Sequence, residues 1–196
     1  METLLEHEVL RVSYVFLPLL GGGIVHGLFI RQDWWPSLKR PIDLNRRIRE
    51  RRVFGDHKTF RGFVAFSLGT TAVVVLQAEV LHAVPAVRHL EAFDYQEVNA
   101  WALGVLVGIA AMLSELPNSF LKRQMDVRPG ATGDGFWWGF FFVVDQIDLL
   151  VGAWFVFSLV TEVTVERLAI SLVLVFLAHN VVNVIGYALG MRHTLR

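Results

Sequence analysis

The stretch FWWGFFFVVDQIDLLVGAWFVFSLV, residues 136–160, decides the fold that we expect for this chain. As a helix it is long enough to cross the roughly 30 Å hydrocarbon core of a bilayer, yet it carries Asp145 and Asp148 near its middle. An unpaired carboxylate in hydrocarbon costs roughly a few kcal/mol, so this face must look onto a polar cavity, a partner cation or a metal. Their spacing of three residues places both side chains on one side of the helix, close enough to share one ion.

Two interpretations of this aspartate pair stay open. In the first, a neutralised pair ties neighbouring helices together and does nothing else. In the second, the pair is a metal or proton site. We favour a functional site, because acids inside a membrane are costly to keep and two of them share one face.

The composition is that of an integral membrane protein. Of the 196 residues 54% are hydrophobic, the mean hydropathy is +0.49, and the apolar runs are too long for a soluble core of this size. Cysteine is absent, which excludes a disulfide framework, a thiolate zinc site and a cysteine nucleophile. Because 18 basic residues balance 18 acidic ones, net charge indicates no class of partner, and we expect no nucleic-acid partner.

Five apolar runs predict an all-α membrane protein made of a single membrane domain, residues 1–196, with about five transmembrane helices. We expect the spans at residues 9–30, 62–82, 98–116, 136–160 and 168–190. The first run follows an acidic start and lacks the basic region and cleavage site of a signal peptide, so it should stay attached. Within it, the glycines at 21–23 favour close packing by a neighbouring helix over a break.

The distribution of basic residues predicts the orientation. Residues 31–61 carry ten lysines and arginines, and 15 of the 18 lie on inner segments if the N-terminus is outside and the C-terminus is cytoplasmic. The loops 31–61 and 117–135 are then cytoplasmic, and we expect a polar cavity open to that side. In the first loop, a short amphipathic helix over about residues 44–52 would lie on the headgroups of anionic lipids.

The third run ends at Pro117, where we expect the helix to break. A new helix would begin at Asn118 or Ser119 and offer its free N–H groups to an anion. Lys122 and Arg123 would add two positive charges one turn later. This segment therefore predicts a phosphate-binding site at the inner end of the third span.

Glu115 is a third acid at the inner end of the same span, where it could reach the face of Asp145 and Asp148. Three carboxylates facing a basic rim suit a divalent cation that bridges polyphosphate, because Mg²⁺ takes oxygen ligands and neutralises the charge on the phosphates that it joins. The sequence thus predicts a metal site of Asp145, Asp148 and Glu115.

A second polar motif, FGDHKTFRG at residues 54–62, ends the first inner loop. Lys58, Thr59 and Arg61 offer donors to an anion, and a glycine permits a tight turn. For Lys58 and Arg61, a phosphate site and a positive-inside anchor are both open interpretations. For the arginines between residues 46 and 52, the anchor is favoured.

Three motifs in order resemble those of the CDP-archaeol synthase family, membrane cytidylyltransferases related to the CDP-diacylglycerol synthases. They are GDHKTFRGF at 55–63, SFLKR at 119–123 followed by PG, and DQID at 145–148. The similarity covers the whole chain, including the five-span layout and the polar Asn180 and Asn183 in the last span.

The resemblance implies a reaction in phospholipid biosynthesis at the cell membrane: CTP and a lipid phosphate, archaeol-type or phosphatidic acid-like, give a CDP-lipid and pyrophosphate with Mg²⁺. The chain departs from the family pattern at Ser114 and Glu115, where the family usually has Gly-Asp, and at Gln124, where it often has a further arginine. The resemblance therefore leaves the lipid open.

The expected site follows from these motifs and from the resemblance together. The catalytic residues would be Asp145, Asp148, Lys122 and Lys58. The metal ligands would be Asp145, Asp148 and Glu115. The residues that bind substrate would be Asp56, Thr59, Arg61, Asn118, Ser119 and Arg123. Which basic pair binds which phosphate is left open.

Two rival functions come from other classes. A small transporter or proton-coupled permease would use Asp145 and Asp148 as a relay, and a lipid-binding scaffold would have no turnover. The transporter explains the acids but not the two basic motifs on the inner face, and five spans without a repeat fit common transporter designs poorly.

Overall fold

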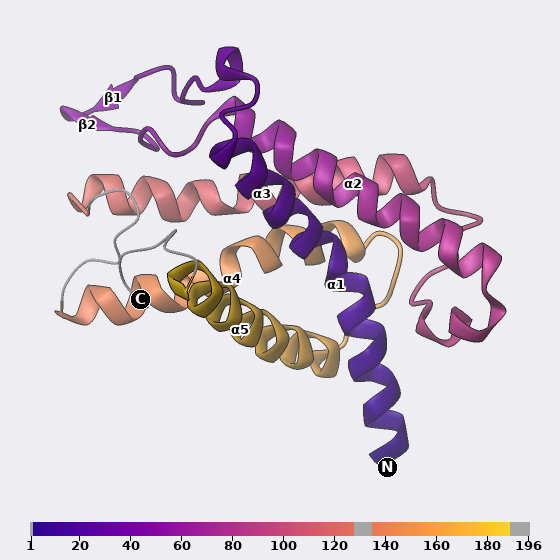
Figure 1. The fold of residues 1–196 in the computed structure, drawn as a ribbon. Helices are drawn as coiled ribbons and strands as arrows, with labels where there is room; N and C mark the ends of the chain where they lie inside the picture. The colour runs from indigo at the N-terminus through magenta and orange to yellow at the C-terminus, as the bar shows by residue number, and fades with distance from the viewer. Residues whose placement is uncertain (1, 128–134, 189–196) are drawn as a thin grey trace.

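The computed structural model of the chain describes residues 2–127 and 135–188. Within these ranges the chain forms five long helices, two short 3-10 helices and one two-stranded hairpin (Figure 1). The long helices are α1 (Glu2–Arg31), α2 (Phe60–Ala83), α3 (Ala100–Gln124), α4 (Gly135–Phe157) and α5 (Val165–Ala188). The short elements are η1 (Pro36–Leu38), β1 (Arg47–Ile48), β2 (Arg51–Arg52) and η2 (Pro85–Leu90).

The expectation of a mostly helical membrane protein is confirmed. In the described part of the chain, the four helices α1 to α4 are long and apolar enough to cross a membrane. Helix α5 covers the fifth predicted span, but its role as a fifth span stays a prediction, as do the sides on which the termini lie.

The expected break at Pro117 is wrong. Helix α3 continues through Pro117 to Gln124, although proline lacks the N–H that would bond to the carbonyl of Leu113. Contacts with other segments support the helix beside Pro117. Asn118 donates to Asp145 and Asp148 of α4, and Glu115 pairs with Lys58. Asn118 and Ser119 therefore lie inside a helix, and their backbone N–H groups do not form the anion-binding helix start that the sequence predicted.

The expected amphipathic helix over residues 44–52 is also wrong, because this segment is an antiparallel hairpin. Arg47 pairs with Arg52 and Ile48 with Arg51. The two residues of the turn, Arg49 and Glu50, have φ values of 49° and 66°. Positive φ at both central positions is the geometry of the tight turn that matches the twist of paired strands.

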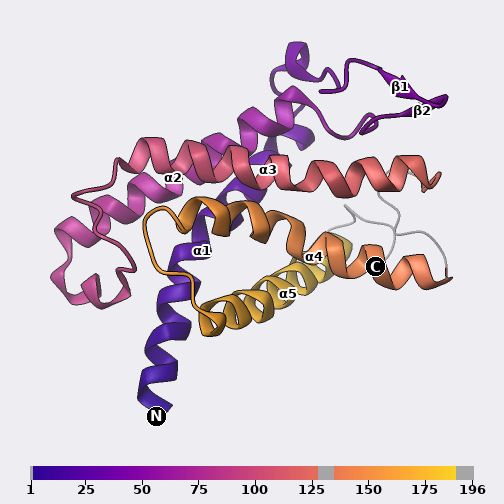
Figure 2. The same ribbon diagram turned by 180° about the vertical axis from the view of Figure 1, so that it is seen from behind.

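Glycines allow the helices to approach closely. Helix α2 packs against α1 and α3, and α4 packs against the other side of α3 (Figures 1 and 2). A Cβ atom on Gly69 would lie 2.4 Å from the carbonyl oxygen of Gly21, and one on Gly152 would lie 2.2 Å from that of Ala110. The expected close packing is confirmed at Gly21 and Gly22, whereas a Cβ on Gly23 would meet nothing within 4 Å; the alternative, a break, does not occur, because α1 is unbroken there.

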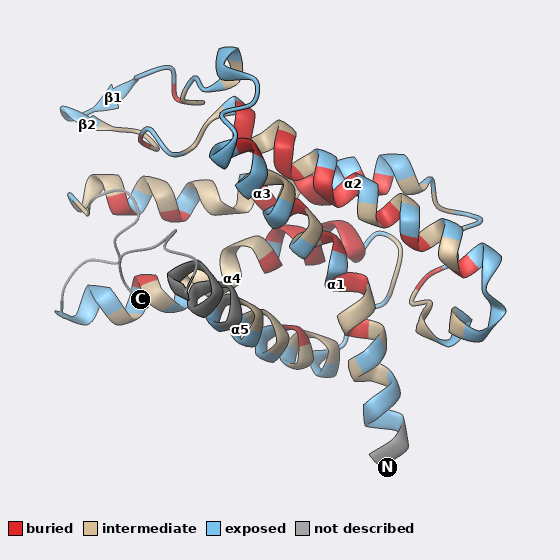
Figure 3. Cartoon of the chain, in the orientation of Figure 1, coloured by how far each residue is buried: buried red, intermediate tan, exposed pale blue. Residues whose placement is uncertain are grey.

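Buried residues gather where α1 to α4 face one another, whereas the outer faces of these helices are exposed (Figure 3). Phe16 of α1 packs against Trp154 and Phe157 of α4, with ring centroids 5.4 and 5.6 Å apart. The indole N–H of Trp154 donates to the hydroxyl of Ser171 in α5 at 2.9 Å. These contacts fix α4, and with it the two aspartates, against α1 and α5.

Candidate active site

The two aspartates of α4 face α3 and share one partner there. The side-chain amide nitrogen of Asn118 lies 2.6 Å from Asp145 Oδ1 and 3.0 Å from Asp148 Oδ2. The other oxygen of Asp148 accepts from the backbone N–H of Leu149 at 2.8 Å. The spacing of three residues thus brings both carboxylates to one face, as the sequence predicted, and Asn118 joins them across the helix interface.

Lys122 lies one turn beyond Asn118 on α3 and pairs with the first aspartate. Its Nζ is 2.6 Å from both carboxylate oxygens of Asp145 and 5.4 Å from the centroid of the Phe141 ring. Lys122 is only 8% exposed, so this charge is largely shielded from water. The pair provides a counter-charge for one of the two carboxylates.

Lys58 reaches the same place from the loop before α2, where it forms an ion pair with Glu115 of α3. Burial lowers the pKa of Lys58 to about 8, although the negative charges of Asp148 and Asp145 act in the opposite direction. The loop therefore brings a second lysine toward the aspartates, and its charge is sensitive to pH near neutrality.

These side chains line one cavity of about 360 Å³. Its lining residues are Phe54, His57, Lys58, Glu115, Asn118, Ser119, Lys122, Arg123, Asp145, Asp148 and Leu149. Two of its buried polar atoms, Asn118 Oδ1 and Arg123 Nε, have no hydrogen-bond partner among the described residues. The cavity thus offers an unused oxygen beside two carboxylates and an unused donor beside two lysines, which suits an anionic ligand that carries a cation.

Three predicted substrate-binding residues lie outside this lining. Asp56 pairs with Arg52 at 2.6 Å, and the hydroxyl of Thr59 caps α2 by accepting from the N–H of Gly62 at 3.1 Å. The guanidinium of Arg61 donates to Asp33 at 2.5 Å. In the structure these side chains hold the loop and the start of α2.

The predicted group of three acids does not form, since Glu115 is held by Lys58. Among the described residues, no cluster of three or more His, Asp or Glu side chains is placed to hold a metal ion. Asp145 and Asp148 remain as a pair of carboxylates on one face.

The sequence pattern did not indicate three of the lining residues, Phe54, His57 and Leu149. Phe54 and His57 lie in the quoted motif, so their proximity to Lys58 was the available signal. Asn180 is exposed and donates to the carbonyl of Phe176 in its own helix at 2.7 Å. The side chain of Asn183 and the PG segment at 129–130 lie outside the described residues.

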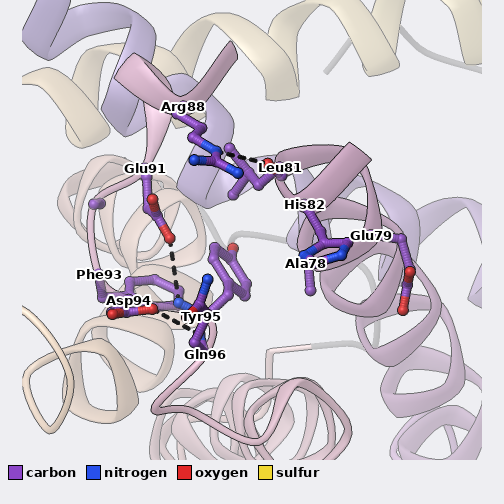
Figure 4. A pocket seen from close by; sticks show the side chains of 11 residues that line it. Ala78, Glu79, Leu81, His82, Arg88, Glu91, Phe93, Asp94, Tyr95 and Gln96 are labelled. Carbon is purple, nitrogen blue, oxygen red and sulfur yellow. Dashed lines mark hydrogen bonds between the residues drawn. The ribbon is translucent and has the colours of Figure 1, made fainter. Parts of the chain in front are cut away.

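A larger cavity of about 770 Å³ lies at the far end of α2, beyond the reach of the aspartates (Figure 4). It is lined by the last turns of α2, by η2 and by the loop that follows, with Arg88, Glu91 and Tyr95 around it. Helix α2 has 24 residues, which span about 36 Å, so the two cavities are at opposite ends of the bundle.

Comparison with known proteins gives one consistent family. The family model for CDP-archaeol synthase matches residues 38–195. CDP-archaeol synthase of Methanospirillum hungatei is 33% identical over 159 residues, which cover 78% of this chain and 87% of the relative. The CDP-archaeol synthase of Methanoculleus marisnigri is 34% identical over 161 residues, with coverage of 78% and 87%.

A solved structure, described as an intramembrane enzyme for the biosynthesis of archaeal membrane lipids, has the same fold. The TM-score is 0.62 at 21% sequence identity, and the match covers 87% of this chain and 91% of the solved one. The similarity thus extends over most of both chains.

Proposed function

Because this chain belongs to the CDP-archaeol synthase family, we propose that it transfers the cytidylyl group of CTP to the phosphate of an archaeol-type lipid. The products would be a CDP-activated lipid and pyrophosphate. The observation that carries this proposal is the single cavity in which Asp145 and Asp148, joined by Asn118, face Lys122 and Lys58.

The reaction is an in-line displacement at phosphorus. An oxygen of the lipid phosphate forms a bond to the α-phosphorus of CTP, and the bond from that phosphorus to the bridging oxygen of the β-phosphate breaks. Pyrophosphate leaves with the electron pair of that bond. A phosphate monoester is already ionised at neutral pH, so no general base is needed and the protein has to align and neutralise two anions.

The residues present fit a magnesium ion. In phosphate sites Mg²⁺ is usually held by one or two carboxylates together with the phosphates themselves, and Asp145 and Asp148 supply two carboxylates on one face. Bound there with CTP, the ion would neutralise the charge that develops on the phosphates. We propose Asp145 and Asp148 as its ligands; Glu115 is engaged by Lys58.

Three cations of the cavity would bind the phosphates. Lys122 and Lys58 are each paired with a carboxylate, and these pairs would exchange one anion for another when polyphosphate enters. Arg123 keeps an unpartnered Nε and can donate to a phosphate oxygen directly. Since the cations are held in place before CTP arrives, little ordering is needed on binding.

We propose that α5 is the fifth span, that the N-terminus is outside, and that the cavity opens to the cytoplasm, where CTP is found. The segment between α1 and α2 carries most of the basic residues, which favours the cytoplasmic side for this loop. Lys58 of the same loop lines the cavity.

The test is an assay of the purified protein with Mg²⁺, CTP labelled at the α-phosphate, and archaeol phosphate or phosphatidic acid. We expect label to enter archaeol phosphate in equal amount to the pyrophosphate released. Label in phosphatidic acid at a similar rate would leave the reaction standing but contradict the archaeol-type substrate. No labelled lipid with either acceptor would contradict the proposed reaction.

A further inference from the structure

The loop between α1 and α2 brings Lys58 to the cavity, yet it has almost no core of its own. Between residues 39 and 60 the buried residues are Asp43 and Gly55. The side chains of the hairpin are mostly exposed, and Ile48 keeps 46% of its surface. Apolar burial therefore cannot fix this loop, and something else must hold its shape.

Asp43 is the centre of the loop's hydrogen bonds. Its carboxylate accepts from Arg52 Nη2 at 2.7 Å and from the backbone N–H groups of Phe54 and Gly55 at 3.0 and 3.1 Å. It also accepts from the N–H of Asn45 at 3.0 Å. The side chain of Asp43 is 1% exposed, so these bonds form away from water, where leaving any of them unmade is costly.

The turn at residues 52–55, which bonds to Asp43, lies next to the cavity. Phe54, which Asp43 holds through its N–H, lines the cavity. On the other side, the N–H of Ile42 donates to the carbonyl of Lys58 at 2.8 Å. Asp43 is therefore connected to Lys58 in two ways. Its neighbour Ile42 bonds to the backbone of Lys58, and its own carboxylate bonds to the turn that precedes Lys58 in the chain.

The turn also packs on α3. Gly55 has a φ of +89°, and a Cβ there would lie 3.3 Å from Cδ of Arg123. Gln124, at the end of α3, donates from its side chain to the carbonyl of Arg52 at 3.4 Å, and its own carbonyl accepts from Arg51. The loop is therefore seated on the helix that supplies the other half of the cavity.

Asp43 stays ionised throughout the working range. Burial raises its pKa, but the hydrogen bonds from Arg52 and from the backbone of Phe54, Gly55 and Asn45 outweigh it and lower the pKa to about 2. Asp43 is thus a permanent anion that faces Arg52 and N–H groups, and it does not line the cavity. It has no role as an acid or base.

We propose that Asp43 is a positioning residue for the reaction: its buried carboxylate accepts hydrogen bonds from the turn at residues 52–55 and thereby holds Lys58 at the cavity. This inference rests on the proposed function. Asp43 touches no reacting atom. It acts through Lys58, and its loss should weaken the hold on polyphosphate while Asp145, Asp148 and Lys122 keep their places on α3 and α4.

The first test is the kinetics of Asp43→Asn, which keeps the size of the side chain and removes its charge. We expect KM for CTP to rise at least about tenfold while kcat changes less than about threefold, because the affected group binds the nucleotide. A merely structural role would lower the amount of active enzyme, and hence apparent kcat, at unchanged KM. Asp94→Asn is the matched control, since Asp94 accepts from a nearby backbone N–H in a loop at the other end of the molecule and should change neither constant.

The second test needs no substrate. The rate at which an amine reagent labels Lys58, followed by mass spectrometry across pH, should have a midpoint near pH 8 in the parent protein. In Asp43→Asn we expect that midpoint to move toward the ordinary value of 10.5 as the loop opens to water. If the parent protein makes no CDP-lipid, the proposed function fails, and this arm still decides whether Asp43 positions Lys58.

A variant of the partner residue covers the case in which Asp43→Asn does not fold. Arg52→Lys keeps the positive charge but loses the planar fork that reaches Asp43 and Asp56, so we expect the same two changes at smaller size. A folded variant with unchanged KM and an unchanged labelling midpoint would overturn the proposal.

Discussion

Lys122 Nζ lies at 2.6 Å from both carboxylate oxygens of Asp145, with the ring of Phe141 on another side of the ammonium. The pair joins α3 to α4 at the cavity. It explains how a membrane helix can carry this aspartate, since a lysine pairs with the carboxylate before any ligand arrives.

Lys122→Met should therefore damage both stability and activity. It removes the cation that pairs directly with Asp145, and because the side chain of Asp145 is 33% exposed, we expect a loss of about 1–3 kcal/mol in the free energy of unfolding. Transfer activity should fall by at least about tenfold. Lys122→Arg should recover part of both, and Arg47→Ala, in the exposed hairpin, should change neither. Full activity in Lys122→Met would contradict a role for this lysine in the transfer reaction.

Gly152→Ala should separate α4 from α3. A Cβ atom at this position would meet the carbonyl oxygen of Ala110 at 2.2 Å and Ser114 Oγ at 2.6 Å, so the backbone must shift. We expect a loss of about 1–3 kcal/mol, measured by denaturant titration in detergent, and reduced transfer because Asp148 is one turn away. Gly139→Ala in the same helix meets nothing within 4 Å and is the control; equal stability of the two variants would contradict the packing.

The pH profile should report Lys58. Its pKa is lowered to about 8 by burial, so the ammonium that we propose as a phosphate ligand is lost as the pH rises through 8. The value of kcat/KM for CTP, which reflects the free enzyme, should fall about tenfold per pH unit above that point. Lys58→Arg keeps its charge at high pH and should lose this alkaline limb. An identical limb in the variant would assign the titration to another group.

Metal titration should separate Glu115 from the aspartates. Because Glu115 pairs with Lys58, Glu115→Gln should change the Mg²⁺ concentration for half-maximal activity by less than about threefold. Asp145→Asn should raise it at least about tenfold, because even the loss of a residue that only supports a ligand costs roughly 10–100-fold in metal affinity. A tenfold rise in Glu115→Gln would restore the metal site of three acids that the sequence indicated.

The helices could be predicted from the sequence because apolar runs of this length have few alternatives in a membrane. The spacing of Asp145 and Asp148 predicted that both lie on one face of the helix. Lys122, which pairs with Asp145, was also among the predicted site residues. These features depend on local pattern, so a single sequence carries them.

What could not be predicted depends on contacts between distant segments. Helix α3 continues past Pro117, where Asn118 and Glu115 bond to other segments of the chain, and no local sequence rule predicts such contacts. The hairpin turns at Arg49 and Glu50, neither of which is a residue typical of positive φ. The buried carboxylate of Asp43 accepts hydrogen bonds from Phe54 and Gly55, which follow the hairpin. Likewise, the sequence did not predict that Glu115 pairs with Lys58, because the two residues lie 57 positions apart.

The most direct test of the central claim is the turnover of Asp148→Asn. This variant keeps a side chain that Asn118 can still contact, so it should fold. It removes the charge of one of the two carboxylates that we propose as ligands of Mg²⁺. With purified protein, Mg²⁺, α-labelled CTP and archaeol phosphate, we predict that formation of labelled CDP-lipid falls by at least about tenfold, since metal charge compensation is worth several kcal/mol. Turnover near that of the parent protein, in a variant shown to be folded, would contradict the account.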